Sequence, residues 1–573
     1  MEGSGPYIQL LAQIPAFAVF DDAQLQTLYC FCALKVLAKG EAASIAGAGV
    51  DELGIVVTGR IATREGAAYA AGRGQAVEVA AFLTRTPARA TAVALRETVL
   101  LTLGWEDLAA AFQASPDLIG TVLSRMGAER VEADRARPAP GRIVICPAGA
   151  GASLDHRAKD ALLAGLEGVA EIRVLTRQSF GAGMPGALAL ESPEIAHWLQ
   201  EQELEFDLTL IVADATDLDF AAEAIEEADE VLFIAGGDDP ALSPLERHAL
   251  EARGAANCRL VFQKGQQAGP VKRAAEWMEP RRYGRAQAVD FDSPAALQLM
   301  GAGLAGKGRT IAAASAGVYA AAILGALQAL EEHGMPAVSL AAAGSAVLPA
   351  GLLACGKLGT AHAMFEELAN PMLWKRSSRP EAGLFDPVPL DNFLVGALQG
   401  LEIPAATRPF AAVSRSLSAG AAEVHRMGRL HGAVRAGIAP PGMLPPLIVE
   451  GGDILVSGEN EAQALLRAAG SLGASPVLSI RTRQQPLGPC PMTYRNLTGS
   501  ALFRAAQTID KRVLASTVLG AAGCSPASAA GARALVLPMP EGISPMDWPQ
   551  WAALRNMGYE WTLMELEAQA GFE

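Results

Sequence analysis

The sequence predicts a multidomain α/β protein with an N-terminal antiparallel β-roll, a middle domain built on a parallel sheet, and a C-terminal α/β domain. The length of 573 residues suits about three domains, at ~150 residues per domain. A charged, proline-rich stretch, ADRARPAPGR (133–142), separates short β-type runs from strands that alternate with helices. A Gly- and Ala-rich segment near residue 300 then begins a second alternation. We therefore expect domains at residues 1–132, 142–290 and 300–573.

The first part shows the pattern of a small β-roll between helices. The segments IPAFAVF and DDAQLQTLYCF have helical patterns, and short apolar runs separated by Gly follow them in DELGIVVTGRIATREG and TAVALRETVLLTLGW. Short strands at close, regular spacing are typical of a small barrel or roll. The segment WEDLAAAFQASPDL then predicts a helix whose first turn carries acidic residues, which suits the helix dipole.

The middle part alternates strands with helices. RIVICPAG, EIRVLT, DLTLIVADA, EVLFIAGG and CRLVFQKG are apolar runs of strand length, and SLDHRAKDALLAGLEG and DFAAEAIEEAD are helical stretches between them. Continuous apolar strands joined by helical crossovers predict a mainly parallel sheet that is covered on both faces.

The third part begins with twenty residues that carry no charge, Ile311 to Leu330. That length suits a membrane-spanning helix. The stretch is mostly Ala, however, and Gly317 and Gly325 interrupt it, so a strand, a tight turn and a buried helix fit the pattern equally well. We adopt this second interpretation.

Composition excludes several classes of partner. The net charge is −15, and a surface that binds nucleic acid needs a basic footprint, so we expect no nucleic-acid partner. The seven cysteines have no spacing typical of a zinc site or a disulfide framework, which favours a reducing compartment and no bound metal. The start, MEGSGPYIQLLAQIPAF, lacks the pattern of a signal peptide. We expect a cytoplasmic protein, or one peripheral to the inner membrane, without a cofactor.

The order of elements in the first part resembles that of a cyclic-nucleotide-binding domain. In that family a cassette G-E-x-A, followed by P-R-S-A-T, places a Glu on the ribose and an Arg on the cyclic phosphate. The matching stretches here are VEVAA (77–81) and PARAT (87–91). Glu78 stands at the ribose position, whereas the Arg position is Ala88 and Arg89 comes one residue late. The resemblance implies a nucleotide sensor or, in our interpretation, a fold kept for packing or dimerisation after ligand binding was lost.

A Gly-rich turn, PAGAGAS (147–153), follows the first strand of the middle part and suggests a dinucleotide site. The G-x-G-x-x-G spacing fails, because no third Gly follows Gly151. We interpret this turn and GGDD (236–239) as structural.

The third part resembles the patatin-like phospholipases of the neuropathy-target-esterase type, which use a Ser–Asp dyad. The segment LGALQALEEHG (324–334) is similar to the helix that follows their oxyanion loop, G-G-G-G-x-R-G. This alignment places the loop on residues 314–320, where only Gly317 remains. The nucleophile elbow G-x-S-x-G falls on residues 343–347, where Ser345 is kept and both outer glycines are lost.

The dyad Asp of that family ends an L-V-D-G strand. Here the same context is LVSG, so Ser457 stands at the position of the base, and AGIAPPGMLPP upstream fixes the same register. Ser457 cannot accept a proton usefully at neutral pH. A second alignment places Glu450 of EGG at the base position, in poorer context. His425 and His431 do not suggest a metal site or a Ser–His arrangement.

The resemblance therefore implies a patatin-like fold with degraded catalytic motifs. We expect a non-catalytic homologue that acts in regulation, scaffolding or lipid sensing, and whose partner is an active patatin-like homologue, a second copy or a lipid surface. The first alternative is an ester hydrolase that uses Ser345 with an unconventional base such as Glu450 or Asp453. The second is a cyclic-nucleotide-responsive protein that uses Glu78.

Overall fold

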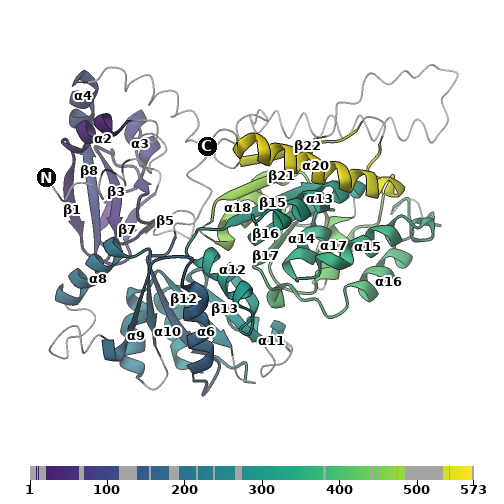
Figure 1. Ribbon diagram of the computed structural model, residues 1–573, viewed down its shortest axis with the longest axis horizontal. Helices are drawn as coiled ribbons and strands as arrows, with labels where there is room; N and C mark the ends of the chain where they lie inside the picture. The colour runs from purple at the N-terminus through teal and green to yellow at the C-terminus, as the bar shows by residue number, and fades with distance from the viewer. Residues whose placement is uncertain are drawn as a thin grey trace.

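A computed structural model shows three parts, each built from strands and helices of its own (Figure 1). The structure describes residues 8, 11, 21–63, 70–88, 90–114, 139–153, 156–179, 193–213, 217–235, 239–264, 274–378, 383–438, 443–449, 451–473, 475–483, 533–540 and 543–570. The expected helix in IPAFAVF and most of the expected 133–142 linker lie outside these ranges.

The N-terminal part is a β-roll of two four-stranded sheets with orders β1-β8-β3-β6 and β2-β7-β4-β5, in which every pair is antiparallel. Its strands are β1 (Ala33–Leu37), β2 (Ala42–Ser44), β3 (Glu52–Thr58), β4 (Ile61–Thr63), β5 (Ala70–Ala71), β6 (Ala76–Val77), β7 (Ala92–Ala94) and β8 (Thr98–Gly104). Its helices are α2 (Asp22–Tyr29), α3 (Val79–Thr84) and α4 (Trp105–Ala114). The predicted roll is confirmed, and α2 and α4 lie within the segments 21–31 and 105–118 that were predicted to be helical.

The middle part is a fully parallel six-stranded sheet with the order β10-β11-β9-β12-β13-β14, as predicted. The strands are β9 (Arg142–Ala148), β10 (Ile172–Thr176), β11 (Leu208–Val212), β12 (Glu230–Ala235), β13 (Cys258–Lys264) and β14 (Arg285–Asp290). The helices are α6 (His156–Leu166), α8 (Pro193–Glu205), α9 (Leu218–Glu227), α10 (Pro244–Ala252), α11 (Ala274–Met278) and α12 (Pro294–Leu304).

Alternate residues of these strands face different helices, as the period of two requires. Along β9, Val144 and Cys146 pack on the face of the sheet that α9 and α10 cover, whereas Ile143 and Ile145 pack on the face that α6 and α12 cover. The sequence analysis missed β14, because Arg and Gln alternate with its small residues in RAQAVD. Both polar side chains are nonetheless buried, and the arginine is satisfied by an ion pair.

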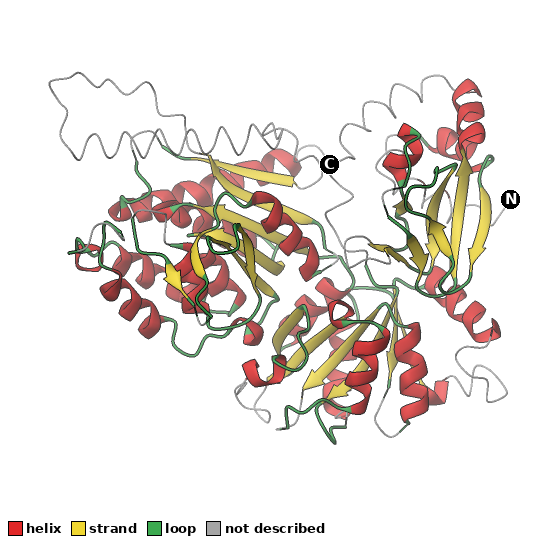
Figure 2. Ribbon diagram, turned by 180° about the vertical axis from the view of Figure 1, so that it is seen from behind, coloured by secondary structure: helices red, strands yellow, loops and turns green. Residues whose placement is uncertain are grey.

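The third part is an eight-stranded sheet with the order β19-β20-β17-β16-β15-β21-β22, and β18 pairs with β17. Figure 2 shows the helices of this part packed around its strands. The strands are β15 (Arg309–Ser315), β16 (Ala337–Gly344), β17 (Phe410–Ser416), β18 (Ala421–His425), β19 (Leu447–Ile448), β20 (Ile454–Ser457), β21 (Val477–Arg483) and β22 (Arg533–Pro538). The helices are α13 (Ala320–Glu332), α14 (Val347–Ala354), α15 (Ala361–Leu368), α16 (Pro387–Ala397), α17 (Leu430–Gly437), α18 (Ala462–Leu472) and α20 (Trp551–Ala570).

Small residues let helices lie close on both faces of this sheet. Ala312 and Ala314 of β15 pack under α18, whereas Ile311 and Ala313 pack under α13 and α14. The uncharged stretch from residue 311 to 330 is thus a strand, a short 3-10 turn (Gly317–Tyr319) and a buried helix, as predicted. Within the described ranges, no helix is long and apolar enough to cross a membrane.

Helices α13 and α20 approach each other through two glycines. A Cβ on Gly325 would lie 1.9 Å from the carbonyl oxygen of Arg555, and a Cβ on Gly558 would lie 2.1 Å from that of Ala322. Both helix backbones are therefore in contact, and neither position has room for a side chain.

We expect Gly325→Ala to lower the melting temperature of the full chain by roughly 3–10 °C, because overpacking costs about 1–3 kcal/mol. The matched control is Gly396→Ala in α16, where a Cβ meets no atom within 4 Å. That change should leave the melting temperature unchanged or raise it, since Ala favours helix. Differential scanning calorimetry of both variants checks this. Equal melting temperatures would show that the α13–α20 contact is looser than described.

Candidate functional site

Ser345 lies in the turn between the end of β16 and the start of α14, at the centre of the third sheet. Its side chain is 1 % exposed. The Oγ atoms of Ser345 and Ser315 are 3.0 Å apart, and the N–H of Ser345 donates to the carbonyl oxygen of Ser315 at 3.0 Å. The hydroxyl and the amide of Ser345 are thus both used inside the protein.

The backbone strain in this turn is at Gly344 and not at the serine. Gly344 has a φ of +66°, and a Cβ there would lie 2.1 Å from the carbonyl oxygen of Ser315. Ser345 is not among the described non-glycine residues with positive φ. In a nucleophile elbow the serine itself occupies the strained turn, with its Oγ exposed. This turn has the order strand, serine and helix, but it does not expose the hydroxyl of Ser345 to solvent.

Another part of the chain packs directly against the segment around Gly317. Gly317 has a φ of +51°, and a Cβ there would lie 1.9 Å from the carbonyl oxygen of Pro545. The next amide, that of Val318, donates to the same oxygen at 2.8 Å. Tyr319, at the position of the family's Arg, donates its hydroxyl to the carbonyl oxygen of Ile543 at 2.7 Å. An oxyanion hole needs free backbone N–H groups aimed at the reacting oxygen, and the N–H of Val318 is already bonded.

Ser457 ends β20, opposite Ser414 of β17. Ser457 is buried, and its Oγ has no hydrogen-bond partner. Two residues later, the Cβ of Glu459 lies 2.9 Å from where a Cβ on Gly344 would be. The structure therefore places the 457–459 segment beside the turn that carries Ser345. The assignment of Ser345 and Ser457 to a former dyad stays a prediction.

Of the two alternative bases, only Asp453 lies within the described residues, and it is not beside Ser345. Asp453 accepts a hydrogen bond from Ser416 at 3.0 Å, at the opposite end of β20, and Glu450 lies outside the described residues. Glu459, which the sequence analysis overlooked, is the carboxylate whose backbone position fits. It follows the LVSG segment directly, which could have revealed it.

A Ser–His pair that the sequence analysis did not expect lies on the neighbouring hairpin. The Oγ of Ser414 and the Nε2 of His425 are 2.6 Å apart, and burial lowers the pKa of His425. The two residues are eleven positions apart and only the β17–β18 hairpin brings them together. Ser414 is itself 1 % exposed, so a substrate cannot reach it in this conformation.

Glu78 lies beside a small pocket in the β-roll. It has a φ of 54°, in the left-handed region, and it precedes α3 without capping that helix through its side chain. The pocket has a volume of about 30 Å³, which is room for about two water molecules. Its polar lining consists of Lys35, Ser44, Glu52, Glu78 and Thr102.

This pocket offers little positive charge with which to bind a cyclic phosphate. Lys35, the one cation among the described lining residues, pairs with Glu52 at 3.2 Å. Ala88, at the position of the family's Arg, is buried, and its N–H donates to the carbonyl oxygen of Ala48. Arg85 instead lies over the ring of Trp105, with its guanidinium carbon 5.2 Å from the ring centroid. Arg89 lies outside the described residues.

The Gly-rich turn of the middle part is closed by a carboxylate of the same domain. The N–H of Gly149 donates to Oε2 of Glu246 at 3.0 Å. Arg281 donates to both oxygens of Glu246, at 2.6 and 2.9 Å, and both side chains are fully buried. Glu246 thus stands where a phosphate would lie in a dinucleotide site, which agrees with a structural turn. Among the described residues, no group of three or more His, Cys, Asp or Glu could hold a metal ion.

Several solved structures are similar to about a fifth of this chain. The N-terminal domain of a transcriptional regulator from Streptomyces coelicolor is 28 % identical, with a TM-score of 0.20 over 22 % of this chain and 90 % of that one. A cyclic nucleotide-binding-like protein from Brucella abortus is 25 % identical, with a TM-score of 0.18 over 18 % and 97 %. A cyclic nucleotide-binding domain from Methylobacillus flagellatus is 17 % identical, with a TM-score of 0.20 over 23 % and 81 %.

No protein-family model and no curated protein matches the chain. These three comparisons cover about a fifth of the chain, and TM-scores this low carry no argument about its fold, ligand or activity. They contain nothing that supports the resemblance of residues 300–573 to patatin-like phospholipases, which stays a prediction.

Proposed function

We propose that this protein is a non-catalytic regulatory or scaffolding protein, in which a β-roll is joined to an α/β domain that no longer performs hydrolysis. The hydrogen bonding of Ser345 carries this proposal, because both its hydroxyl and its amide are bonded to Ser315. The bond from Val318 to Pro545 and the missing carboxylate at Ser457 point the same way. In serine hydrolases, loss of the acidic partner alone lowers the rate by about 10⁴-fold.

The competing function is an ester hydrolase that uses Ser345 with an unconventional general base. The position of Glu459 beside Gly344 favours Glu459 over Asp453 as the base of such a hydrolase. It requires Ser345 to break its contact with Ser315 and to reach solvent.

We expect a fluorophosphonate probe to leave the wild-type chain unlabelled, because the Ser345 hydroxyl is buried and is hydrogen-bonded to the hydroxyl of Ser315. Gel fluorescence of the full chain measures this, with Ser345→Ala and Ser414→Ala as matched variants. Labelling that disappears only in Ser345→Ala would establish the hydrolase. If Glu459→Gln also abolished that labelling, Glu459 would be its base. Labelling lost only in Ser414→Ala would move the activity to the Ser414–His425 pair.

A second candidate function is a response to a cyclic nucleotide, and the pocket beside Glu78 favours it. The pocket is small and its cation is already paired. We therefore propose that the β-roll acts through packing.

We expect saturating cAMP or cGMP to leave the melting temperature of the wild-type chain unchanged, because a ligand stabilises only a protein that binds it. Differential scanning fluorimetry measures this, with Glu78→Ala as the paired variant. A nucleotide-dependent rise in the wild type that vanishes in Glu78→Ala would show a nucleotide sensor, contrary to the proposal.

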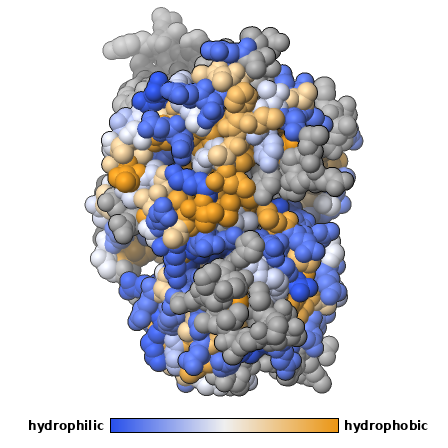
Figure 3. Space-filling model, turned by 90° about the vertical axis from the view of Figure 1, so that its left-hand side faces the viewer, coloured by the Kyte–Doolittle hydropathy of each residue, from blue (hydrophilic) through white to orange (hydrophobic). Residues whose placement is uncertain are grey.

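Two apolar surfaces suit the expected partners. The edge strand β1 exposes Leu34 and Val36, which are 54 % and 59 % exposed, on the side of the β-roll where apolar surface gathers (Figure 3). An open strand edge favours pairing with another chain, so we propose that this surface binds a second copy or a homologous protein. In the third part, Met372 and Val395 are exposed, and Lys375 follows Met372 by three residues. The turn that carries Met372 contacts α16, which carries Val395. We propose that this surface suits an anionic lipid surface.

We expect Val36→Lys to reduce self-association in sedimentation velocity, since a charged residue on an edge strand opposes pairing. Val395→Glu, at a similarly exposed valine of α16, is the control and should sediment like the wild type. In flotation with phosphatidylserine-containing vesicles the roles reverse: Val395→Glu should weaken binding, because it replaces an apolar contact by a negative charge, while Val36→Lys should not weaken it. A monomeric wild type would exclude the second copy, and a wild type that does not float would exclude the lipid surface.

A further inference from the structure

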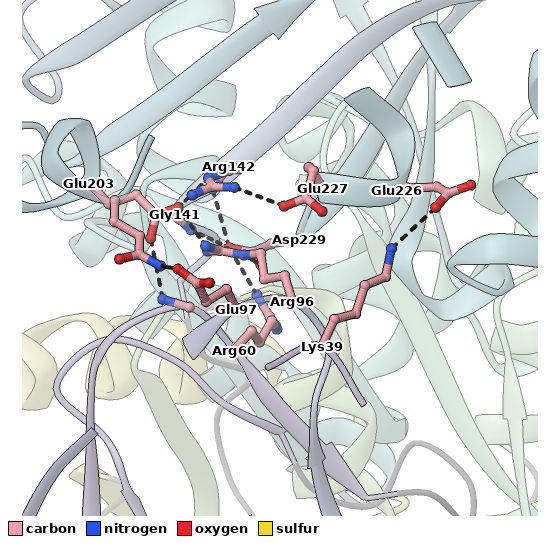
Figure 4. A network of polar contacts seen from close by, with 12 residues as sticks. Lys39, Arg60, Arg96, Glu97, Gly141, Arg142, Glu203, Glu226, Glu227 and Asp229 are labelled. Atoms are coloured by element: carbon pink, nitrogen blue, oxygen red, sulfur yellow. Dashed lines mark hydrogen bonds and ion pairs between the residues drawn. The ribbon is translucent and has the colours of Figure 1, made fainter. Parts of the chain in front are cut away.

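Three arginines meet two carboxylates where the β-roll contacts the middle part (Figure 4). Arg96 lies 2.8 Å from Glu203 and 3.3 Å from Asp229, and Arg60 lies 3.8 Å from Asp229. Arg142 also pairs with Glu203. None of these five side chains is more than 5 % exposed. The contact between the two parts therefore contains a cluster of buried charges.

The topology explains how these residues meet. Arg60 lies in the turn between β3 and β4, and Arg96 lies in the turn between β7 and β8, so both come from one end of the β-roll. Arg142 is the first residue of β9, and Asp229 directly precedes β12. The β-roll thus rests on the amino ends of the parallel strands, at the opposite edge from the turn at Gly149.

The arginines of this cluster offset the cost of burying the carboxylate of Asp229. Burial opposes ionisation of Asp229, but Arg96 and Arg60 outweigh it and hold the pKa of this carboxyl well below its usual range. Asp229 also accepts hydrogen bonds from the amides of Gly141 and Arg142, at 2.8 and 3.2 Å. Loss of one charged partner would leave an uncompensated buried charge, which is strongly destabilising.

The next residue along the chain extends the cluster away from the β-roll. Glu230 lies 2.9 Å from Arg259 of β13 and 2.7 Å from Arg285 of β14. All three side chains are at most 4 % exposed. Buried ion pairs therefore run along the amino ends of β9, β12, β13 and β14.

The far end of this row reaches the third part. Arg259 lines a pocket of about 10 Å³ together with Val338 and Pro409, and the N–H of Ala288 in β14 donates to the carbonyl oxygen of Ala406 at 2.7 Å. Burial lowers the pKa of Arg426, which follows β18, and the charge of Arg285 lowers it further.

We propose that this ion belt couples the position of the β-roll to that of the third part, with Asp229 and Glu230 as its central link. The belt consists of Arg60, Arg96, Arg142, Glu203, Asp229, Glu230, Arg259 and Arg285.

The link is physical because Asp229 and Glu230 are consecutive residues at the start of one strand. A shift of Arg60 or Arg96 that moves Asp229 must also move Glu230, and with it Arg259 and Arg285. The electrostatics are continuous as well. Burial lowers the pKa of Arg60. The negative charges of Asp229 and Glu230 oppose that effect, whereas the positive charges of Arg96 and Arg285 add to it. This coupling would give the proposed regulatory function a route through the molecule, and it does not depend on Ser345.

Hydrogen–deuterium exchange of the full chain tests the coupling with Asp229→Asn, which keeps the shape and removes the charge. We expect amide exchange to become about tenfold faster or more in the 59–61 turn of the β-roll and also in the third part near Ala406 and Arg426. Glu226→Gln is the matched control, because Glu226 pairs with Lys39 across the same contact at 3.1 Å but both side chains are partly exposed. It should leave exchange in the third part unchanged.

Faster exchange confined to the β-roll and the middle part of Asp229→Asn would overturn the proposal. If that variant does not fold, Arg60→Gln removes the same pair from the side of the β-roll and is judged by the same two segments. The result is independent of probe labelling at Ser345, so failure of the coupling and failure of the proposed function remain distinguishable.

Discussion

The buried carboxylate of Asp229 is the constraint on which the arrangement of this protein depends. It lies at the amino edge of the middle sheet and holds Arg96 and Arg60 of the β-roll, while its neighbour Glu230 holds Arg259 and Arg285. Buried ion pairs add little net stability compared with apolar packing, but they are costly to break once formed. Their main effect is therefore to determine which surfaces meet, and their net contribution to the free energy of unfolding is small.

The third part shows a different principle, in which close packing leaves little room for chemistry. Its central strands are rich in alanine, and helices lie against both faces. The turn after β16 is compact because Gly344 approaches the carbonyl of Ser315, which also accepts the hydrogen bond from Ser345. The carbonyl of Pro545 fills the region beside Gly317. Groups that would stabilise a transition state in a hydrolase here stabilise the fold.

Much of the fold could be predicted from local patterns. The apolar runs that become β9, β11, β12 and β13 are continuous, because both faces of a parallel sheet are buried. The strand β14 was missed, because RAQAVD carries Arg285 and Gln287, whose burial depends on ion pairs and contacts from other strands. Likewise Ser414 and His425 show no local signal, since a hairpin register brings them together.

By itself the sequence determined the element types and the identities of Ala88, Tyr319 and Ser457, the residues that the predicted resemblances align with motif positions, because hydrophobic period and residue identity are local properties. Only the tertiary structure decided what took the place of the lost groups. The bond between Ser345 and Ser315, the carbonyl of Pro545 beside Gly317, and Glu459 beside Gly344 all join segments far apart in the chain. The ion belt is of the same kind, since charges distant in sequence are buried only where strand ends from different sheets converge.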